Sequence, residues 1–220
     1  MQRVHLKKTT NREEWLKERK KGIGASEASC IIGVNPWKTN VELWQEKTGQ
    51  REPEDIGDKD CVMYGKKAEE LVRGLFELDY PGYKVEYDEF GMIANRPNEP
   101  WLFATLDGHI IGGNKNGVLE IKTTTIQQSS QWEHWNGQVP DYYYTQILHQ
   151  FLATGYDFAI LRADIRYYKG TELRHTVRDY YFERDNEQIK ADMEYLLHKE
   201  KEFWNCVQTR KSPNLILPEI

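Results

Sequence analysis

Alternating apolar and polar residues mark two closely spaced segments near the middle of the chain. Segments 101–111 and 117–125 are rich in β-branched and aromatic residues, and a turn dense in Gly and Asn separates them. Such a pattern is typical of a β-hairpin. A similar segment at 83–94 precedes the pair and completes a predicted antiparallel meander, and two further strands are expected near 157–167 and 174–183.

Helical patterns and capping residues surround these strands. Asn11 is a suitable N-cap for a helix over 11–21, and Thr39 with Glu42 forms the capping box of a helix that stops at Gly49. Further helices are expected from a Ser26 cap to about Gly33, over 63–78, from Pro140 to Gly155, and over 186–207. Strands interleaved with helices in this order predict a mixed α/β fold, with a central mixed β-sheet flanked by helices.

The apolar positions of the 63–78 helix recur at helical spacing and predict which face is buried. The predicted buried stripe consists of Ala68, Leu71, Val72, Leu75 and Phe76. At about 100° per residue, Glu69 falls on the border of this stripe, whereas Glu70 and Glu77 fall on the solvent side. A carboxylate at the core boundary is placed to bind a metal ion or orient a water molecule. The alternative is a surface glutamate that borders the core without a function.

Length and composition suit one folded domain. The chain has 220 residues, of which 39% are hydrophobic and 12% aromatic, enough for a sizeable core. We expect a single domain, 1–220, with an N-terminal helical part (1–62), a central core (63–185) and a C-terminal helix (186–220).

The sequence indicates neither a secreted nor a membrane protein. The first residues lack the apolar run of a signal peptide, and no apolar stretch reaches the length of a membrane span. Cys30, Cys61 and Cys206 are far apart, in no spacing typical of metal ligands. Such cysteines are typical of free thiols in a reducing compartment. A cytoplasmic protein is therefore expected.

The net charge of −5 does not by itself indicate a nucleic-acid-binding protein. Its distribution is uneven, because residues 1–22 contain eight basic and three acidic residues, a local excess of five positive charges. A basic region on an acidic protein is compatible with an enzyme that binds DNA and also needs carboxylates. The same distribution occurs in many proteins without that activity.

Three side chains of the predicted hairpin have a chemically suggestive spacing. Glu120 and Lys122 are two residues apart on one strand, so they share a face, and Asp107 comes from the neighbouring strand. Two carboxylates beside a lysine form a site for a hard cation, as metal-assisted phosphodiester hydrolysis requires. Taken alone, the pattern is weak, because a solvated ion pair beside an Asp-Gly turn is the commoner origin of these residues.

Other candidates lie on either side of the hairpin in the sequence. Arg19 precedes a Gly-Ile-Gly-Ala turn that ends in Ser26, and such a turn before a helix is suited to bind phosphate. In the 141–155 helix, Gln146, His149 and Gln150 fall away from the apolar side, where amides can bind a phosphate oxygen or simply face solvent. Trp132 and Trp135 occupy a polar connection and are candidates for base stacking, while most other tryptophans are assigned to the core.

Taken in order, these pieces resemble the YqaJ-type viral recombinase nucleases, phage alkaline exonucleases related to lambda exonuclease within the PD-(D/E)XK superfamily. The resemblance runs from Arg19 to about Gly155, and Leu106 stands where a Pro is frequent in that superfamily. It is carried by five blocks: Arg19-x-x-x-Ile23-Gly-Ala-Ser26-Glu27, Gly65-Lys66-x-x-Glu69, Leu106-Asp107-Gly108, Leu119-Glu120-Ile121-Lys122 and Val139-Pro140-x-x-x-Tyr144-x-Gln146.

The resemblance implies a PD-(D/E)XK, restriction-endonuclease-like core and a Mg²⁺-dependent 5′→3′ exonuclease that digests linear double-stranded DNA and leaves 3′ single strands for recombination by annealing. Asp107, Glu120 and the backbone carbonyl of Ile121 would bind Mg²⁺, for which Mn²⁺ can substitute. Glu69 would be a further acid near a second metal ion, and Lys122 would orient or activate the attacking water. Substrate-binding residues would be Arg19, Ser26 and Gln146, at the 5′-phosphate.

The implied partners are double-stranded DNA ends, a single-strand annealing protein and further copies of the chain in a ring such as a trimer. A restriction- or resolvase-like endonuclease on the same core is the main alternative. A non-catalytic DNA-binding module is another, although it has no use for an acidic site facing phosphates. An iron–sulfur nuclease is disfavoured because it needs four cluster cysteines and this chain has three scattered ones. A retaining glycosidase also uses two carboxylates, but its mechanism has no role for Lys122.

Overall fold

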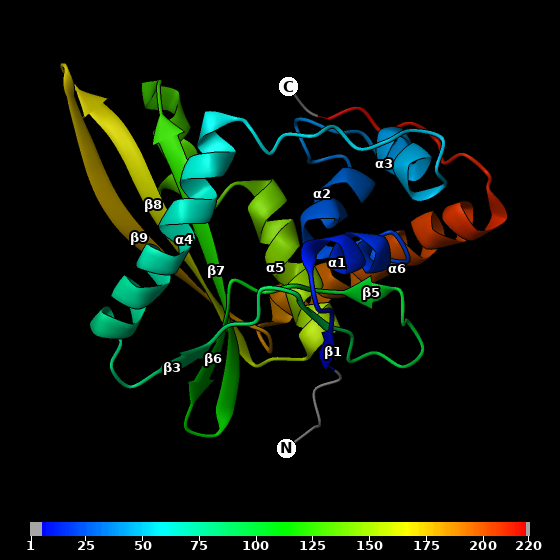
Figure 1. Cartoon of the computed structure of the whole chain (residues 1–220), viewed down its shortest axis with the longest axis horizontal. Coiled ribbons are helices and arrows are strands. Elements are labelled where there is room, and N and C mark those ends of the chain that lie inside the picture. Colours follow the sequence, from blue (N-terminus) through cyan, green and yellow to red (C-terminus); the bar gives the residue numbers. More distant parts are fainter. Residues whose placement is uncertain (1–5, 219–220) are drawn as a thin grey trace.

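The computed structural model describes residues 6–218, so residues 1–5 of the basic N-terminal stretch and residues 219–220 lie outside the described part. Its centre is a five-stranded mixed sheet in the order β3-β6-β7-β8-β9 (Figure 1). All neighbouring strands are antiparallel except β7 and β8, which are parallel. The strands are β3 (Lys84–Glu86), β6 (Gly108–Gly112), β7 (Lys115–Ile126), β8 (Phe158–Lys169) and β9 (Glu172–Glu183).

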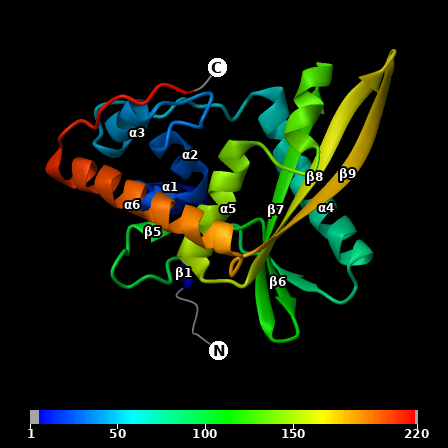
Figure 2. The same cartoon turned by 180° about the vertical axis from the view of Figure 1, so that it is seen from behind.

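Helices cover both faces of this sheet, which confirms the predicted mixed α/β fold. Helix α4 (Asp60–Asp79) packs on one face, where Val72 and Phe76 join the apolar side chains of β6 to β8. Helix α5 (Asp141–Thr154) packs on the other face and forms the crossover between the parallel strands. Helix α6 (Glu187–Thr209) lies against α5 on the side away from the sheet (Figure 2).

The N-terminal elements form a smaller layer beside α5 and α6. They contribute Ile23, Leu43 and Trp44 to a core that Phe203 of α6 completes. Strand β1 pairs with β4, and β2 pairs in parallel with β5, in two small sheets of their own. The elements of this layer and of its two small sheets are β1 (Leu6–Lys8), α1 (Arg12–Arg19), β2 (Ile23–Gly24), the 3₁₀ helix η1 (Ala25–Glu27), α2 (Ala28–Ile31), α3 (Asn40–Lys47), β4 (Gly91–Ile93) and β5 (Leu102–Phe103). The 3₁₀ helix η2 (Ser129–Trp135) lies elsewhere, after β7, and packs against the central sheet.

Several predicted helix ends are confirmed. The Asn11 side chain accepts a hydrogen bond from the backbone of Glu14, and Thr39 with Glu42 forms the complete capping box of α3. Gly155 ends α5 with a φ of 71°, a left-handed conformation that glycine adopts without the strain a side chain would bring. Among the described residues, no helix combines the length and apolar character needed to cross a membrane. All three cysteines are free thiols.

The prediction of one continuous strand at 83–94 and another at 101–111 is wrong. Each is divided in the structure, because its two halves pair with different partners: β3 and β6 join the central sheet, whereas β4 and β5 pair with N-terminal strands. The second break falls at Asp107. There the backbone N–H of Ile121 on β7 donates to the Asp107 carboxylate instead of to a strand carbonyl.

The buried face of α4 is narrower than predicted. Leu71 and Leu75 are 69% and 52% exposed, so their assignment to the core is wrong. The buried residues of α4 are those of one i, i+4, i+8 row, which consists of Ala68, Val72 and Phe76. Glu70 and Glu77 are exposed as predicted, and Glu69 is half-buried at the border of the packed face.

A buried contact between a histidine and a carboxylate joins α5 to α6. His149 was expected on a polar face, but its side chain is fully buried, with Nδ1 2.5 Å from Glu200 Oε1 and Nε2 2.9 Å from the carbonyl of Phe103. Burial alone would lower the pKa of His149, but the Glu200 carboxylate outweighs it and the pKa is raised. The helix pair is therefore held partly by a buried histidine–carboxylate contact that favours the protonated form of His149.

Replacing Glu200 with glutamine is expected to destabilise the protein by about 3 kcal/mol at pH 6, because it leaves a buried imidazole without its counter-charge. A raised pKa means that the stabilisation is complete below the unfolded-state pKa of about 6.5 and is lost as pH rises through the folded-state pKa. Urea unfolding at pH 6 and pH 9 measures this effect. The difference between wild type and variant should shrink at the higher pH, and an equal difference at both values would contradict it.

Candidate active site

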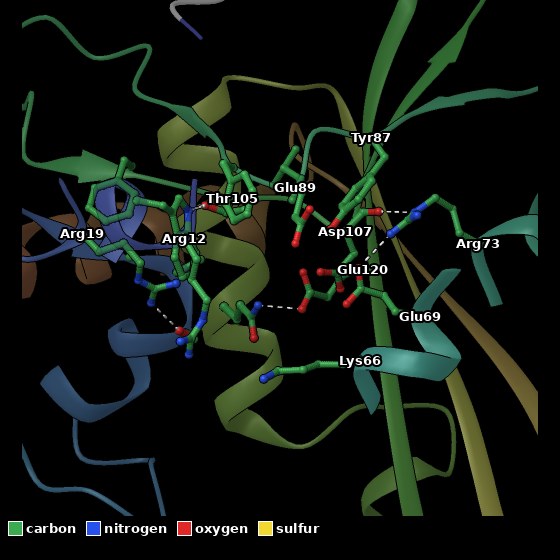
Figure 3. A pocket seen from close by; sticks show the side chains of 18 of the residues that line it. Arg12, Arg19, Lys66, Glu69, Arg73, Tyr87, Glu89, Thr105, Asp107 and Glu120 are labelled. Carbon is green, nitrogen blue, oxygen red and sulfur yellow. Dashed lines mark hydrogen bonds and ion pairs between the residues drawn. The ribbon is translucent and has the colours of Figure 1, made fainter. Parts of the chain in front are cut away.

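A pocket of about 710 Å³ lies between the N-terminal layer and the central sheet (Figure 3). Side chains from α1, η1, α4, β7, α5 and the connection before β6 line it. In Figure 3, Arg12 and Arg19 lie on one side of the pocket, and Glu69, Asp107 and Glu120 on the other. All side chains predicted as site residues contribute to its wall: Arg19, Ser26, Glu69, Asp107, Glu120, Lys122 and Gln146.

Asp107 is positioned where the chain leaves one small sheet and enters the central one. Its Oδ2 accepts a hydrogen bond of 2.8 Å from the backbone N–H of Ile121, which fixes the carboxylate beside β7. Burial raises the pKa of Asp107 well above its usual value, and the nearby carboxylate of Glu120 raises it further. The Lys122 ammonium opposes this shift. The role of the Ile121 carbonyl as a metal ligand stays a prediction.

Glu120 is 1% exposed, although it is a charged residue in the middle of a strand. It forms an ion pair with Lys122, and its Oε1 and Oε2 accept hydrogen bonds from Gln146 and Gln150 of α5. Burial would lower the pKa of Lys122, but Glu120 and Asp107 outweigh it and the pKa is raised. The pocket wall therefore carries an ammonium group next to two carboxylates.

Arg73 holds Glu69 in place and was not singled out from the sequence. Its guanidinium donates to Glu69 Oε1 at 2.8 Å and to the backbone carbonyl of Asp107 at 2.7 Å, and it lies 3.6 Å from the ring centroid of Tyr87. Burial raises the pKa of Glu69, Arg73 opposes the shift, and Glu120 adds to it. The i, i+4 spacing of Glu69 and Arg73 on a helix is the sequence signal that could have revealed this pair.

Arg19 and Ser26 form the basic side of the pocket. The Arg19 guanidinium donates to Ser26 Oγ at 3.3 Å and lies 4.6 Å from the ring centroid of Trp15, whose Nε1 donates to Thr105. A Cβ at Gly24 would come within 3.3 Å of Arg19, so the glycine leaves room for the guanidinium. The prediction that Ser26 caps a helix is wrong, because the Glu27 carboxylate accepts the Gly24 N–H and Ser26 lies inside η1.

The polar residues of α5 differ from the prediction. Gln146 lines the pocket, but its Nε2 donates to Glu120 Oε1 at 2.6 Å. Gln150 is fully buried, so its assignment to a solvent-facing side is wrong. Helix α5 is covered on two sides, by β7 and by α6, which leaves its polar row little contact with solvent.

The tryptophan predictions also need correction. Trp135 is buried against Tyr143 and Tyr180, so it is not available to stack on a base, and Trp132 is half-buried against Tyr167. Trp37 is 72% exposed, so it does not belong to the core. Trp15, half-buried beneath Arg19, is the tryptophan of the pocket wall.

The donor set of the pocket suits a hard divalent cation. Asp107, Glu120 and Glu69 offer only oxygen ligands, which Mg²⁺ prefers. The pKa values of Asp107 and Glu69 are raised mainly by burial and further by the charge of Glu120. Within residues 6–218, no three His, Cys, Asp or Glu side chains are already arranged around a single metal position. The Glu120 carboxylate is instead engaged by Gln146, Gln150 and Lys122.

A mixed sheet flanked by helices, with Asp107, Glu120 and Lys122 at one pocket, is the arrangement expected from the resemblance to PD-(D/E)XK nucleases. Solved structures agree. The alkaline exonuclease LHK-Exo of Laribacter hongkongensis aligns with a TM-score of 0.61 at 18% identity over 91% of this chain and 96% of that chain. A phage-related exonuclease of Haemophilus somnus 129PT aligns with a TM-score of 0.55 at 12% identity over 87% and 96%. At these identities the likeness establishes the fold.

Residues 14–157 match the model of the YqaJ-like viral recombinase domain. The uncharacterized protein YqaJ of Bacillus subtilis (strain 168) is 34% identical over 200 residues, which cover 89% of this chain and 56% of that protein. The chain thus belongs to the YqaJ-like viral recombinase domain family, and the resemblance noted from the motifs is confirmed. The chain spans about half the length of this curated relative.

Proposed function

We propose that the chain is a Mg²⁺-dependent exonuclease that digests linear double-stranded DNA from 5′-phosphorylated ends and leaves 3′ single strands. The observation that supports this most is the joining of two chemistries in one pocket. A basic side with Arg19 and Ser26 is suited to an anion, and a side with Asp107, Glu120 and Lys122 is suited to a metal ion and a phosphodiester. Such a pocket explains why cleavage would occur at an end.

In this proposal, the Asp107 and Glu120 carboxylates and the Ile121 carbonyl hold one metal ion, and Glu69 lies near a second. A metal ion bound there would polarise the scissile phosphate and make a bound water molecule more acidic. Lys122 would orient the attacking water and offset the charge that develops on the phosphate oxygens. Arg73 would keep the Glu69 carboxylate aimed at the pocket through its 2.8 Å hydrogen bond.

The wider setting is suggested by the family resemblance and is part of the same proposal. The chain would act as one nuclease domain, in which the part up to residue 62 binds the 5′-phosphate and 63–185 carries out hydrolysis. The exposed 3′ strand would pass to a single-strand annealing protein. Several copies, for instance three, would form a ring around the DNA in the cytoplasm, and Mn²⁺ would substitute for Mg²⁺.

Digestion of three DNA substrates with Mg²⁺ tests this function: a linear duplex with 5′-phosphates, the same duplex with 5′-hydroxyls, and a covalently closed circle. The expected result is fastest loss of the phosphorylated linear DNA, an intact circle and accumulation of 3′ single strands. Nicking or linearisation of the circle would favour an endonuclease on the same fold. No cleavage with either Mg²⁺ or Mn²⁺ would favour a DNA-binding module.

A further inference from the structure

Two glutamines of α5 hold the buried carboxylate of Glu120, one at each oxygen. Gln146 Nε2 donates to Oε1 at 2.6 Å, and Gln150 Nε2 donates to Oε2 at 2.5 Å. The two glutamines are four residues apart and therefore share one face of the helix. Lys122 also pairs with Oε1, so this oxygen carries two partners.

The two glutamines differ in their access to the pocket. Gln150 is fully buried behind the pocket wall, and its amide donates to Glu120. Gln146 is half-buried and lines the same pocket as Arg19 and Ser26. Its amide has two possible acceptors: the Glu120 carboxylate and an anion held by the basic side of the pocket.

We propose that Gln146 couples recognition of the DNA end to metal binding by exchanging one acceptor for the other. Without substrate, its amide occupies Glu120 Oε1. When a 5′-phosphate binds beside Arg19 and Ser26, the amide turns to the phosphate, and Oε1 keeps Lys122 as its one partner and gains room to bind the metal ion. Gln150 stays on Oε2 throughout and acts as a positioning residue. This inference rests on the proposed function, because it needs both a 5′-phosphate and a metal ion in the pocket.

Such an exchange makes the two binding events cooperative. Binding of either the 5′-phosphate or the metal ion breaks the hydrogen bond between Gln146 and Glu120, so the other ligand binds without that free-energy cost. Each ligand therefore strengthens binding of the other by the same factor. The metal ion should therefore strengthen binding of a phosphorylated end more than binding of a hydroxyl end. Couplings of this kind amount to about tenfold in affinity. If Gln146 only positioned Glu120, the metal ion would strengthen binding of both ends by the same factor.

The coupling can be measured with short duplexes that differ only in a 5′-phosphate or a 5′-hydroxyl. Fluorescence anisotropy gives the dissociation constant of each duplex in EDTA and in Ca²⁺, with denaturing gels to verify that the DNA stays intact. For the wild type, the gain in affinity from Ca²⁺ should be about tenfold larger for the phosphorylated duplex. In Gln146→Leu this excess should vanish, while thermal unfolding and a second variant, Gln146→Ala, exclude misfolding as the cause.

Gln150→Leu is the matched control, because it removes the other amide from the same carboxylate. It should weaken the gain from Ca²⁺ for both duplexes and keep the excess for the phosphorylated one. An excess that survives in Gln146→Leu, or is absent in the wild type, would overturn the coupling. Digestion of phosphorylated linear DNA with Mg²⁺, measured alongside, separates the two levels: digestion without coupling overturns this inference alone, and no digestion overturns the proposed function.

Discussion

Replacing Glu120 or Lys122 with alanine is expected to lower the rate of Mg²⁺-dependent DNA digestion by about 1,000-fold or more, with the fold retained. Glu120 offers the most buried carboxylate of the pocket, and Lys122 places an ammonium beside it. Removing a group that stabilises the charge developing in a transition state typically has an effect of this size. Initial rates on a 5′-phosphorylated linear duplex, together with circular dichroism of each variant, provide the measurement.

Lys115→Ala is a suitable control for this pair of variants. Lys115 lies on the same strand, is exposed and has only a 4.0 Å contact with Glu183. Its removal takes one positive charge from β7 without touching the pocket, and the rate should stay near that of the wild type. Full activity in Glu120→Ala or in Lys122→Ala would remove the assignment of the pocket as an active site.

The placement of these side chains was predictable because strand geometry is local. Alternation along a strand puts Glu120 and Lys122 on one face and Leu119 and Ile121 on the other. The structure bears this out, since Leu119 and Ile121 are packed in the core under α4. The position of Asp107 near this pair was also predictable, because Asp107 directly precedes β6 and β6 pairs with β7, the next strand in the sequence.

Long-range packing set the limit of prediction from the sequence. Spacing on α5 separates a polar row from an apolar row, but it does not show that α6 and β7 together bury His149 and Gln150. The partners of these buried polar side chains are far away in the sequence: His149 contacts Glu200, and the amide of Gln150 donates to Glu120. No local pattern indicates such partners.

The same limit explains the two divided strands. A segment with the composition of a strand forms a ladder with whichever partner tertiary packing provides. The predicted strand 101–111 contains residues for two sheets, and Leu102–Phe103 pairs with β2 from the N-terminal layer. This pairing brings η1, which carries Ser26, to the pocket. The part of the fold that sequence reasoning missed thus positions the basic side of the site.

Replacing Arg19 with alanine is expected to slow digestion of a 5′-phosphorylated duplex by about 10- to 100-fold and that of a 5′-hydroxyl duplex only slightly. A hydrogen bond to a charged group contributes about 1.5–3 kcal/mol, which corresponds to this range. Arg19 is held on Trp15 and Ser26, so its guanidinium is already oriented before DNA binds. Rates for both duplexes, at equal concentrations of enzyme and DNA, give the ratio directly.

Lys20→Ala separates a specific phosphate contact from a general effect of charge. Lys20 is adjacent to Arg19, is exposed, and pairs with Glu52 at 3.4 Å. Its removal takes the same charge from the same part of the molecule, so both duplexes should lose any electrostatic attraction equally. A preference for 5′-phosphate that disappears in Arg19→Ala and persists in Lys20→Ala would place the terminal phosphate at Arg19. Equal losses on the two duplexes in Arg19→Ala would instead mean that Arg19 contributes only to DNA attraction, and the end would have to be recognised elsewhere in the pocket.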